Sequence, residues 1–523
     1  MARILQGCRP DEAMRGDVDQ PHVDQASPEV EPTADEQRRE RQSGLFGRGL
    51  LYVIVFSMQT VIATVVSPVL AHLVGPVEFG WIATAIALVQ MLVVFNVLGL
   101  DQAVVLQRSE DSDDRSSRGL LMVAIVLATT VTGVLALTAG WWGPFLGFGP
   151  LSPLLLGTLV WTFAGGCTAV VLGLLLSEDR LRLVTIVTGI AGVGGPLLGV
   201  VLVALRGPSA TSYVIGVMSA QVVAMLIAVA AVRPRPRGLR ELRTTQRAFA
   251  IGFPIAISGM AGFVLNAGDR IVIQRLLGPA QVGRYQVAYT IGYVVILLLM
   301  FTSQAWAPRF AEIRDRTARL ALTEQTRNEL YRLLMPVVLG ITLASPVVLL
   351  VVAPASFDRQ PLVLVVFLIA ISAFPVAASG ASTRELFTLR KGRALAVAGV
   401  TAAAVNIGLN LWLVPPLGIA GAAIATALAL SLQGVLQLLS IPERRLWPRT
   451  PTRIWLGIVA ICLLGLISTQ LPQTLAWNLV RLAVALACLP WFVSRLVSAR
   501  TGKPLRWRRR SEEVLPRRAA EGR

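Results

Sequence analysis

An aspartate and an arginine stand side by side within a long apolar stretch of this sequence, at Asp269 and Arg270. An ionisable residue at the centre of a membrane helix costs about 2.5–3.5 kcal/mol on insertion scales, so it usually faces a partner or a wet cavity. Gly259, Gly262 and Asn266 precede the pair at helical steps of three and four. This strip predicts a helix face that lines a cavity. The alternative is that the pair only anchors the helix at the membrane interface.

Arginine suits phosphate oxygens, which makes Arg270 the candidate for binding a phosphate group. Arg384, beside Glu385, is a second candidate near the end of its apolar segment. Asp269 would hold Arg270 in place or bind a coupling ion. Other polar residues in the apolar segments are suited to bonding sugar hydroxyls, with hydrogen bonding between helices as the alternative. They are Asn266, Tyr285, Tyr289, Asn406, Asn410, Gln59 and Asn96.

Metal and acid–base chemistry find little support in the sequence. It has two histidines, His22 and His72, so a mechanism that needs histidine is hard to build. The four cysteines lie far apart, without metal-ligand spacing or a disulfide framework. They are Cys8, Cys167, Cys462 and Cys488. We therefore expect no metal and no cofactor.

The composition indicates a polytopic membrane protein. Of the 523 residues, 54% are hydrophobic and 15% are charged, against about 25% charged residues in soluble domains. Fourteen apolar segments are each long enough for a bilayer, which takes about 20 residues of helix. The predicted segments are 48–73, 79–104, 119–142, 151–176, 181–205, 210–232, 248–277, 281–307, 331–353, 361–388, 393–415, 417–441, 453–472 and 475–498.

These segments predict an all-α protein of two six-helix bundles followed by two extra helices. The predicted parts are a disordered cytoplasmic tail at 1–44, bundles at 45–232 and 248–441, a linker at 233–247, the extra helices at 453–498 and a basic tail at 499–523. The N-terminal tail lacks the apolar region of a secretory signal. The charged segment 309–330 is predicted to be helical, either on the membrane surface or in water.

The net charge of +18 follows from the orientation of the chain in the membrane. Arginines cluster in every second connection, as in 233–247 and 309–332, whereas the intervening connections carry few. By the positive-inside rule both termini are cytoplasmic. The basic tail fits a position near anionic lipid. Nucleic acid is therefore not needed as a partner to explain the charge.

A short repeat relates the two predicted bundles. Residues 73–80 read LVGPVEFG and residues 276–283 read LLGPAQVG, and each octapeptide lies between two long apolar segments. Six helices per repeat bring both halves in from the same side, as in some secondary transporters. A weaker echo, PPLGIAGAAIAT, begins at Pro415. Because the first bundle has Val66 and Ser67 at the place of Asp269 and Arg270, the charge is not repeated.

Three longer stretches carry a resemblance to a known family. They are LVGPVEFGWIATAIALVQMLVVFNVLGLDQAVV at 73–105, FPIAIS with DRIVIQRLLGPAQVGRYQVAYTI within 253–291, and VNIGLNLWLVPPLGIAGAAIATALA at 405–429. In this order they resemble the Wzx-type polysaccharide flippases of the multidrug/oligosaccharidyl-lipid/polysaccharide exporter superfamily. The resemblance implies two bundles in a MATE-like V around a central cavity.

The resemblance also implies a function. It implies translocation of an undecaprenyl-diphosphate-linked oligosaccharide to the outer leaflet of the cell membrane, for cell-surface polysaccharide biosynthesis. The implied partners are that lipid-linked substrate, membrane lipids, and a polysaccharide polymerase and glycosyltransferases.

Other functions remain open at this point. A lipid II flippase of the superfamily has cavity cations on its first helices, but this chain has none between Gly49 and Ala71. Some drug exporters of the superfamily have an acid in the first helix, which is also absent here. A membrane polymerase or ligase needs a sizeable outer domain with an acid–base set, whereas the outer connections here are short. A scaffold without transport is the remaining alternative.

Overall fold

A computed structural model describes residues 34–110, 114–148, 152–304, 313, 315–442, 447 and 449–501. The chain divides into two units, Met1–Leu51 and Tyr52–Arg523. Within the first unit the structure describes only residues 34–51, which belong to the first helix. Residues 1–33 and 502–523, which contain most of the two predicted tails, lie outside the described residues.

The described part of the chain consists of helices joined by short turns and contains no strand. The first half comprises α1 (Ala34–Val97), α2 (Leu100–Glu110), α3 (Asp114–Leu137), α4 (Ala139–Phe145), α5 (Pro153–Ser177), α6 (Leu181–Gly189), the π-helix η1 (Ile190–Gly194), α7 (Gly195–Arg206), α8 (Ala210–Val232) and the short 3₁₀-helix η2 (Pro236–Arg240). The second half comprises α9 (Leu242–Phe263), the π-helix η3 (Val264–Gly268), α10 (Asp269–Leu277), α11 (Pro279–Gln304), α13 (Arg316–Val352), η4 (Ala355–Phe357), α14 (Arg359–Ile371), α15 (Ala373–Thr388), α16 (Gly392–Leu439), α17 (Thr452–Gln470) and α18 (Leu475–Thr501).

Twelve of the described helical stretches are long and apolar enough to cross a membrane. Two of these stretches each contain two helical segments, because Gly75 in α1 and Gly418 in α16 have non-helical backbone angles. The predicted fold class, an all-α polytopic membrane protein with about fourteen crossings, is confirmed. Helices prevail because hydrocarbon offers no hydrogen bonds, so each spanning segment must satisfy its own backbone polar groups.

The repeated octapeptides form equivalent turns. Gly75 has φ 72° and ψ 177°, and Gly278, at the same place in the second copy, has φ 84° and ψ 173°. A side chain would be strained in this conformation, which explains glycine at both positions. Pro76 and Pro279 follow, where the fixed φ of proline suits the first turn of a new helix. Gly418, in the weaker third echo, has φ 60°.

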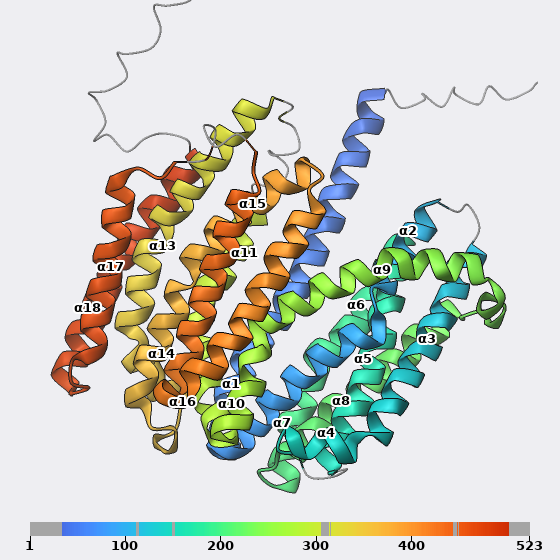
Figure 1. Ribbon diagram of the computed structural model, residues 1–523, viewed down its shortest axis with the longest axis horizontal. Helices are drawn as coiled ribbons and strands as arrows, with labels where there is room; N and C mark the ends of the chain where they lie inside the picture. Colours follow the sequence, from blue (N-terminus) through green and yellow to red (C-terminus); the bar gives the residue numbers. More distant parts are fainter. Residues whose placement is uncertain are drawn as a thin grey trace, which may run out of the picture. The chain divides into compact units, whose positions relative to one another are not determined.

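The helices of each half pack mainly against one another. In the first half α5 and α7 pack on α8, and α2 and α3 pack on α5. In the second half α11 packs on α14, and α15 packs on α16. Figure 1 shows the two groups of helices, with α9 running from α2 and α3 toward α10. The long helix α9 thus belongs to the second half but begins against the first.

The two halves meet at both ends of their helices. The hydroxyl of Thr84 in α1 donates to the side-chain carbonyl of Gln274 in α10 at 3.2 Å. The guanidinium of Arg275 lies over the ring of Phe145, 5.2 Å from its centroid. At the other end a Cβ on Gly99 would collide with the backbone of Gly252. These contacts hold α10 and α9 against the first half.

The two extra helices cover one side of the second half. Both α17 and α18 pack on α13 (Figure 1). Arg481 of α18 is buried, and its Nη2 donates to the carbonyl oxygens of Ser468 and Leu471, each at 2.7 Å. Since the last carbonyls of a helix have no partner within it, Arg481 completes the end of α17.

Three predicted boundaries differ from the structure. Helix α1 begins at Ala34, so residues 34–44 of the predicted disordered tail are helical. Helix α9 begins at Leu242, inside the predicted linker. The charged segment 309–330 does not form a separate helix where it is described, because α13 begins at Arg316 and continues to Val352. The Asp315 carboxylate caps that start by accepting from the backbone N–H of Ala318 at 2.7 Å.

Candidate functional site

The predicted charge pair follows directly on an interruption in a long membrane helix. Helix α9 passes into the π-helix η3, and Asp269 is the first residue of α10 beyond it. A π-helix bonds i to i+5, so it shifts backbone carbonyls away from their usual partners. The carbonyl of Asn266 within η3 accepts from Arg270 Nη1 at 2.7 Å and from the Tyr289 hydroxyl at 3.1 Å. The irregular helix therefore supplies an acceptor for two side chains.

Asp269 and Arg270 form a closed ion pair. Arg270 Nη1 donates to Asp269 Oδ1 at 2.7 Å, and Arg270 Nε donates to Gln286 Oε1 at 3.0 Å. The hydroxyl of Tyr285 donates to the second carboxylate oxygen of Asp269. Asp269 is 1% exposed and Arg270 is 5% exposed. A buried charge pair is stable only when its remaining hydrogen-bonding groups are satisfied, and α11 supplies these partners.

Three tyrosines on α11 stand beside the pair at helical steps of four. The guanidinium carbon of Arg270 lies 3.9 Å from the ring centroid of Tyr289 and 5.6 Å from that of Tyr285. Tyr289 in turn stacks on Tyr293, with centroids 5.2 Å apart. A desolvated cation over an aromatic ring gains about 2 kcal/mol or more. The tyrosines thus stabilise Arg270 in its charged form.

The observed geometry bears on both predictions for the pair. An interfacial anchor would extend its charge into water, whereas both charges here are buried and have partners from η3 and α11. The guanidinium is also not fully exposed on a cavity-lining face, because its Nε donates to Gln286 and its Nη1 donates to the Asn266 carbonyl. The side chain of Asn266 is exposed, and its amide donates to the Gly262 carbonyl at 2.7 Å. The polar strip therefore presents Asn266, with the ion pair directly behind it.

The structure brings Asn266, Asp269, Arg270, Tyr285 and Tyr289 together. It places the other predicted residues elsewhere, in contacts between or within helices. Asn96 is buried and donates to the Thr132 hydroxyl at 3.0 Å. Asn410 donates to the backbone carbonyl of Asn406, and Asn406 donates to Thr426. No hydrogen bond in the described part of the chain links these asparagines to the ion pair.

Gln59 contacts the segment around η1, the π-helix of the first half. Its amide donates to the Thr188 carbonyl at 3.1 Å, just before the π-helix η1. A Cβ on Gly192 within η1 would collide with the Gln59 amide. Gln59 therefore supports an irregular helix turn from a distant segment, in the same manner as Tyr289 at η3.

Sequence reasoning missed Gln286 and Thr290, which extend the network. Gln286 accepts from Arg270 Nε, and its amide donates to Thr290 Oγ1 at 3.4 Å. Each follows a tyrosine of α11 by one position, so the four residues form two adjacent polar stripes. The sequence signal for these two residues was the spacing of four between Gln286 and Thr290, which matches the spacing between Tyr285 and Tyr289.

A second buried ion pair was also missed. Glu385 of α15 is fully buried, and its Oε2 accepts from Arg319 Nε at 3.1 Å. Arg316 Nε lies 3.9 Å from the other carboxylate oxygen. These contacts join the starting end of α13 to the end of α15, on the predicted cytoplasmic side. The second phosphate candidate, Arg384, is the neighbour of this buried acid.

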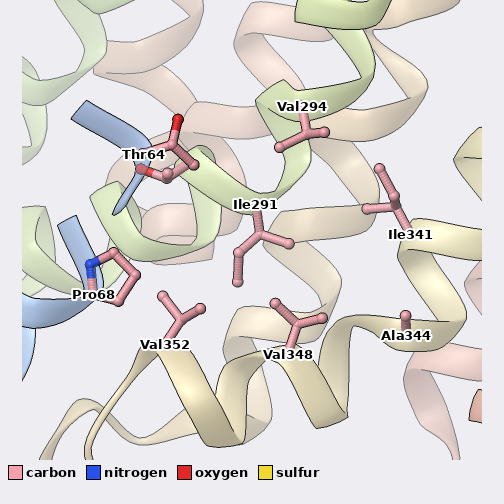
Figure 2. A pocket seen from close by; sticks show the side chains of 9 residues that line it. Thr64, Pro68, Ile291, Val294, Ile341, Ala344, Val348 and Val352 are labelled. Carbon is pink, nitrogen blue, oxygen red and sulfur yellow. The ribbon is translucent and has the colours of Figure 1, made fainter. Parts of the chain in front are cut away.

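Figure 2 shows an apolar pocket. One of its lining residues, Thr290, also belongs to the network around Arg270. The volume of the pocket is about 250 Å³, and α1, α11 and α13 line it. Thr64 and Pro68 approach from α1, and Ile341, Ala344, Val348 and Val352 lie on α13, with Ile291 and Val294 of α11 between them. Thr290 of α11 also lines the pocket. Among the described residues, no three His, Cys, Asp or Glu side chains gather as a metal site would require.

Comparisons with known proteins place the chain in context. A family model described as "Polysaccharide biosynthesis protein" matches residues 46–314. Among solved structures, "Lipid II flippase MurJ, inward closed conformation" is similar with a TM-score of 0.63 and 14% identity, covering 87% of this chain and 100% of that one. An inward-facing multidrug resistance MATE family transporter of the MOP superfamily is similar with a TM-score of 0.56 and 13% identity, covering 77% of this chain and 95% of that one. No match was found among curated protein sequences.

Proposed function

Because the chain belongs to the polysaccharide biosynthesis protein family, we propose that it is a flippase for a lipid-linked oligosaccharide. The resemblance drawn from the sequence is confirmed by that membership and by the shared fold. The proposed substrate carries its sugar on undecaprenyl diphosphate and moves from the cytoplasmic to the outer leaflet of the cell membrane. No covalent bond changes in this process, so the proposed activity is transport and not enzymatic catalysis.

The observation that carries the proposal is the buried ion pair at the π-helix. Arg270 commits Nε and Nη1 to the protein, which leaves Nη2 for a phosphate oxygen. The hydroxyl of Tyr285 holds Asp269 independently of Arg270. The carboxylate thus keeps one partner when the guanidinium turns toward a ligand. Arg270 could then leave Asp269 to bind the diphosphate and return when the diphosphate is released, and transport requires such reversible binding.

The substrate's three parts have different solvation needs, and the proposal assigns each a place. The sugar needs hydrogen-bonding groups, which the exposed Asn266 side chain supplies beside the pair. The diphosphate needs a cation, and Arg270 provides it. The polyprenyl tail needs hydrocarbon and remains in an apolar environment throughout. Asp269 is also our candidate for the residue that responds to a coupling ion.

The flippase proposal is tested by the leaflet in which the substrate accumulates. In protoplasts of a deletion strain, complete lipid-linked units should stay protected from an impermeant glycosidase or lectin. Complementation with the intact gene should restore their exposure. A polymerase or ligase would instead leave single units exposed outside and unjoined, and that result would reject the proposal. Loss of drug resistance with normal glycan export would favour the exporter alternative.

The proposed orientation places both termini in the cytoplasm, as the arginine distribution indicates. A polysaccharide polymerase on the outer face and glycosyltransferases on the inner face are the proposed functional partners. Their reactions consume and supply the transported lipid-linked unit.

A further inference from the structure

The pocket of Figure 2 has few polar atoms with which to hold water. Seven of its nine lining residues are Pro, Ile, Val or Ala, and the other two are Thr64 and Thr290. The Thr290 hydroxyl donates to the Gln286 carbonyl at 2.9 Å. Thr64 also has a partner. Buried water needs two to four polar partners. The pocket is therefore a site for hydrocarbon.

The same pocket is joined to the cation by hydrogen bonds. Thr290, in the pocket wall, accepts from the Gln286 amide, and Gln286 accepts from Arg270 Nε. One side chain thus separates the apolar wall from the guanidinium. Tyr285 and Tyr289, which surround Arg270, lie on the same helix as Ile291 and Val294 of the pocket. A cation beside a dry pocket is complementary to a molecule with an anionic head and an apolar chain.

Given the proposed function, on which this inference rests, we propose that the pocket between α1, α11 and α13 holds the prenyl chain of the lipid-linked substrate next to its diphosphate. The first isoprene units would contact Ile291, Ala344 and Val348 while the diphosphate engages Arg270. Val294, at the rim, is 40% exposed, which gives the rest of the chain a way out to the bilayer.

The geometry favours a prenyl diphosphate over a phospholipid of the bilayer. A phospholipid keeps its phosphate at the membrane surface, and its acyl chains descend from there. Here the cation is 5% exposed and is held by hydrogen bonds to η3 and α11. A lipid whose phosphate lies beside Arg270 would place its chain at Thr290 and Ile291, within the protein.

The test uses photolabelling of the purified full-length protein in phosphatidylglycerol nanodiscs. The probe is a polyprenyl diphosphate with a diazirine on an isoprene unit near the head. Mass spectrometry should find the label on α1, α11 and α13, at pocket residues. Ala344→Phe, which fills the pocket, should reduce labelling at least tenfold. The matched control is Val351→Phe on the same helix, where residue 351 is 70% exposed and outside the pocket.

Three outcomes would overturn the proposal. The label is found on other helices of the wild-type protein, or Ala344→Phe labels as strongly as Val351→Phe. The third is a phosphatidylglycerol with a diazirine on its acyl chain that labels the pocket as strongly as the prenyl probe, which would assign the site to bilayer lipid. Mapping the wild-type label decides the matter even when Ala344→Phe does not fold.

Failure of the proposed function gives a different pattern. Normal glycan export in the deletion strain, together with prenyl labelling of the pocket, would reject the flippase and keep the lipid site. Stranded units in that strain, together with no labelling of the pocket, would keep the flippase and reject the site.

Discussion

Gly80 and Gly283 lie face to face where the two halves of the protein meet. A Cβ on Gly80 would collide with the carbonyl oxygen of Pro279 and come within 3.0 Å of the Gly283 nitrogen. A Cβ on Gly283 would collide with the carbonyl oxygen of Pro76 and come within 3.1 Å of the Gly80 nitrogen. The two glycines end the repeated octapeptides, so the contact is reciprocal.

Alanine at either glycine should therefore destabilise the protein to a similar degree. We expect Gly80→Ala and Gly283→Ala each to cost about 1–3 kcal/mol, as overpacking of a filled site does. The obstacle is backbone and cannot rotate away. Thermal unfolding in detergent measures the effect. Gly133→Ala is the matched control, because nothing lies within 4 Å of a Cβ there. Equal melting temperatures for all three variants would contradict the prediction, because they would show that the two backbones move apart at this contact without a loss of stability.

The proposed phosphate role of Arg270 gives a second prediction. Arg270→Ala should abolish export, and Arg270→Lys should keep part of it, because lysine keeps the charge without the planar fork. The measurement is surface glycan in a deletion strain that carries each variant, normalised to the protein level in the membrane. Normal export by the alanine variant would show that Arg270 does not bind the substrate.

Stability must be separated from transport at this site. Arg270→Ala leaves the Asp269 charge buried without its partner, which costs about 3–5 kcal/mol in other proteins. The double variant Asp269→Asn with Arg270→Gln removes both charges and should recover most of the stability. If that variant folds and still exports, the pair serves the fold alone.

The second buried ion pair predicts which of two arginines contributes more to the stability of the protein. Arg319→Ala should destabilise strongly, by about 3–5 kcal/mol, because it removes the closer partner of a fully buried acid. Arg316→Ala should cost less, because Arg316 lies 3.9 Å from Glu385 and its side chain is 29% exposed. Thermal unfolding of both variants in detergent measures the difference. The reverse order would contradict this account of Glu385.

The predicted orientation is tested in intact cells that carry variants of the protein with a single introduced cysteine and none of its own cysteines. Cysteines at Pro208 and Thr474 should react with an impermeant maleimide, whereas one at Arg243 should react only after permeabilisation. Pro208 is preferable to its neighbour Gly207, whose φ of 106° disfavours a side chain. Reaction at position 243 in intact cells would reverse the orientation.

The membrane spans were predictable from sequence because hydrocarbon imposes one requirement on every spanning segment. The turn at Gly278 was predictable because its octapeptide repeats that at Gly75. The start of α13 was not, since the charged residues after Arg316 extend the same helix beyond its apolar part.

Hydrogen-bond partners were harder to predict. Gln59 bonds a carbonyl 129 positions away, and Arg319 pairs with an acid 66 positions away. Nothing local distinguishes these residues from ones that bind a substrate. For the same reason the sequence placed Asn96 and Asn406 among the candidates, whereas the structure shows Asn96 bonded to α3 and Asn406 bonded to Thr426, beyond the Gly418 kink of α16.

The π-helix at Val264–Gly268 also makes the length of this segment matter as much as its composition. An α-helix advances about 100° per residue. Deleting one residue, such as Ala267, would let the segment relax to ordinary α-helix. Because a π-helical turn holds about one residue more than an α-helical turn, the faces of α9 and α10 would stay nearly in register. The Asn266 carbonyl would then return to an ordinary partner within the helix and would no longer accept from Arg270 and Tyr289. A one-codon deletion would thus remove a backbone acceptor and spare the side chains of the site, whereas a substitution at the same position would change a side chain and keep the acceptor.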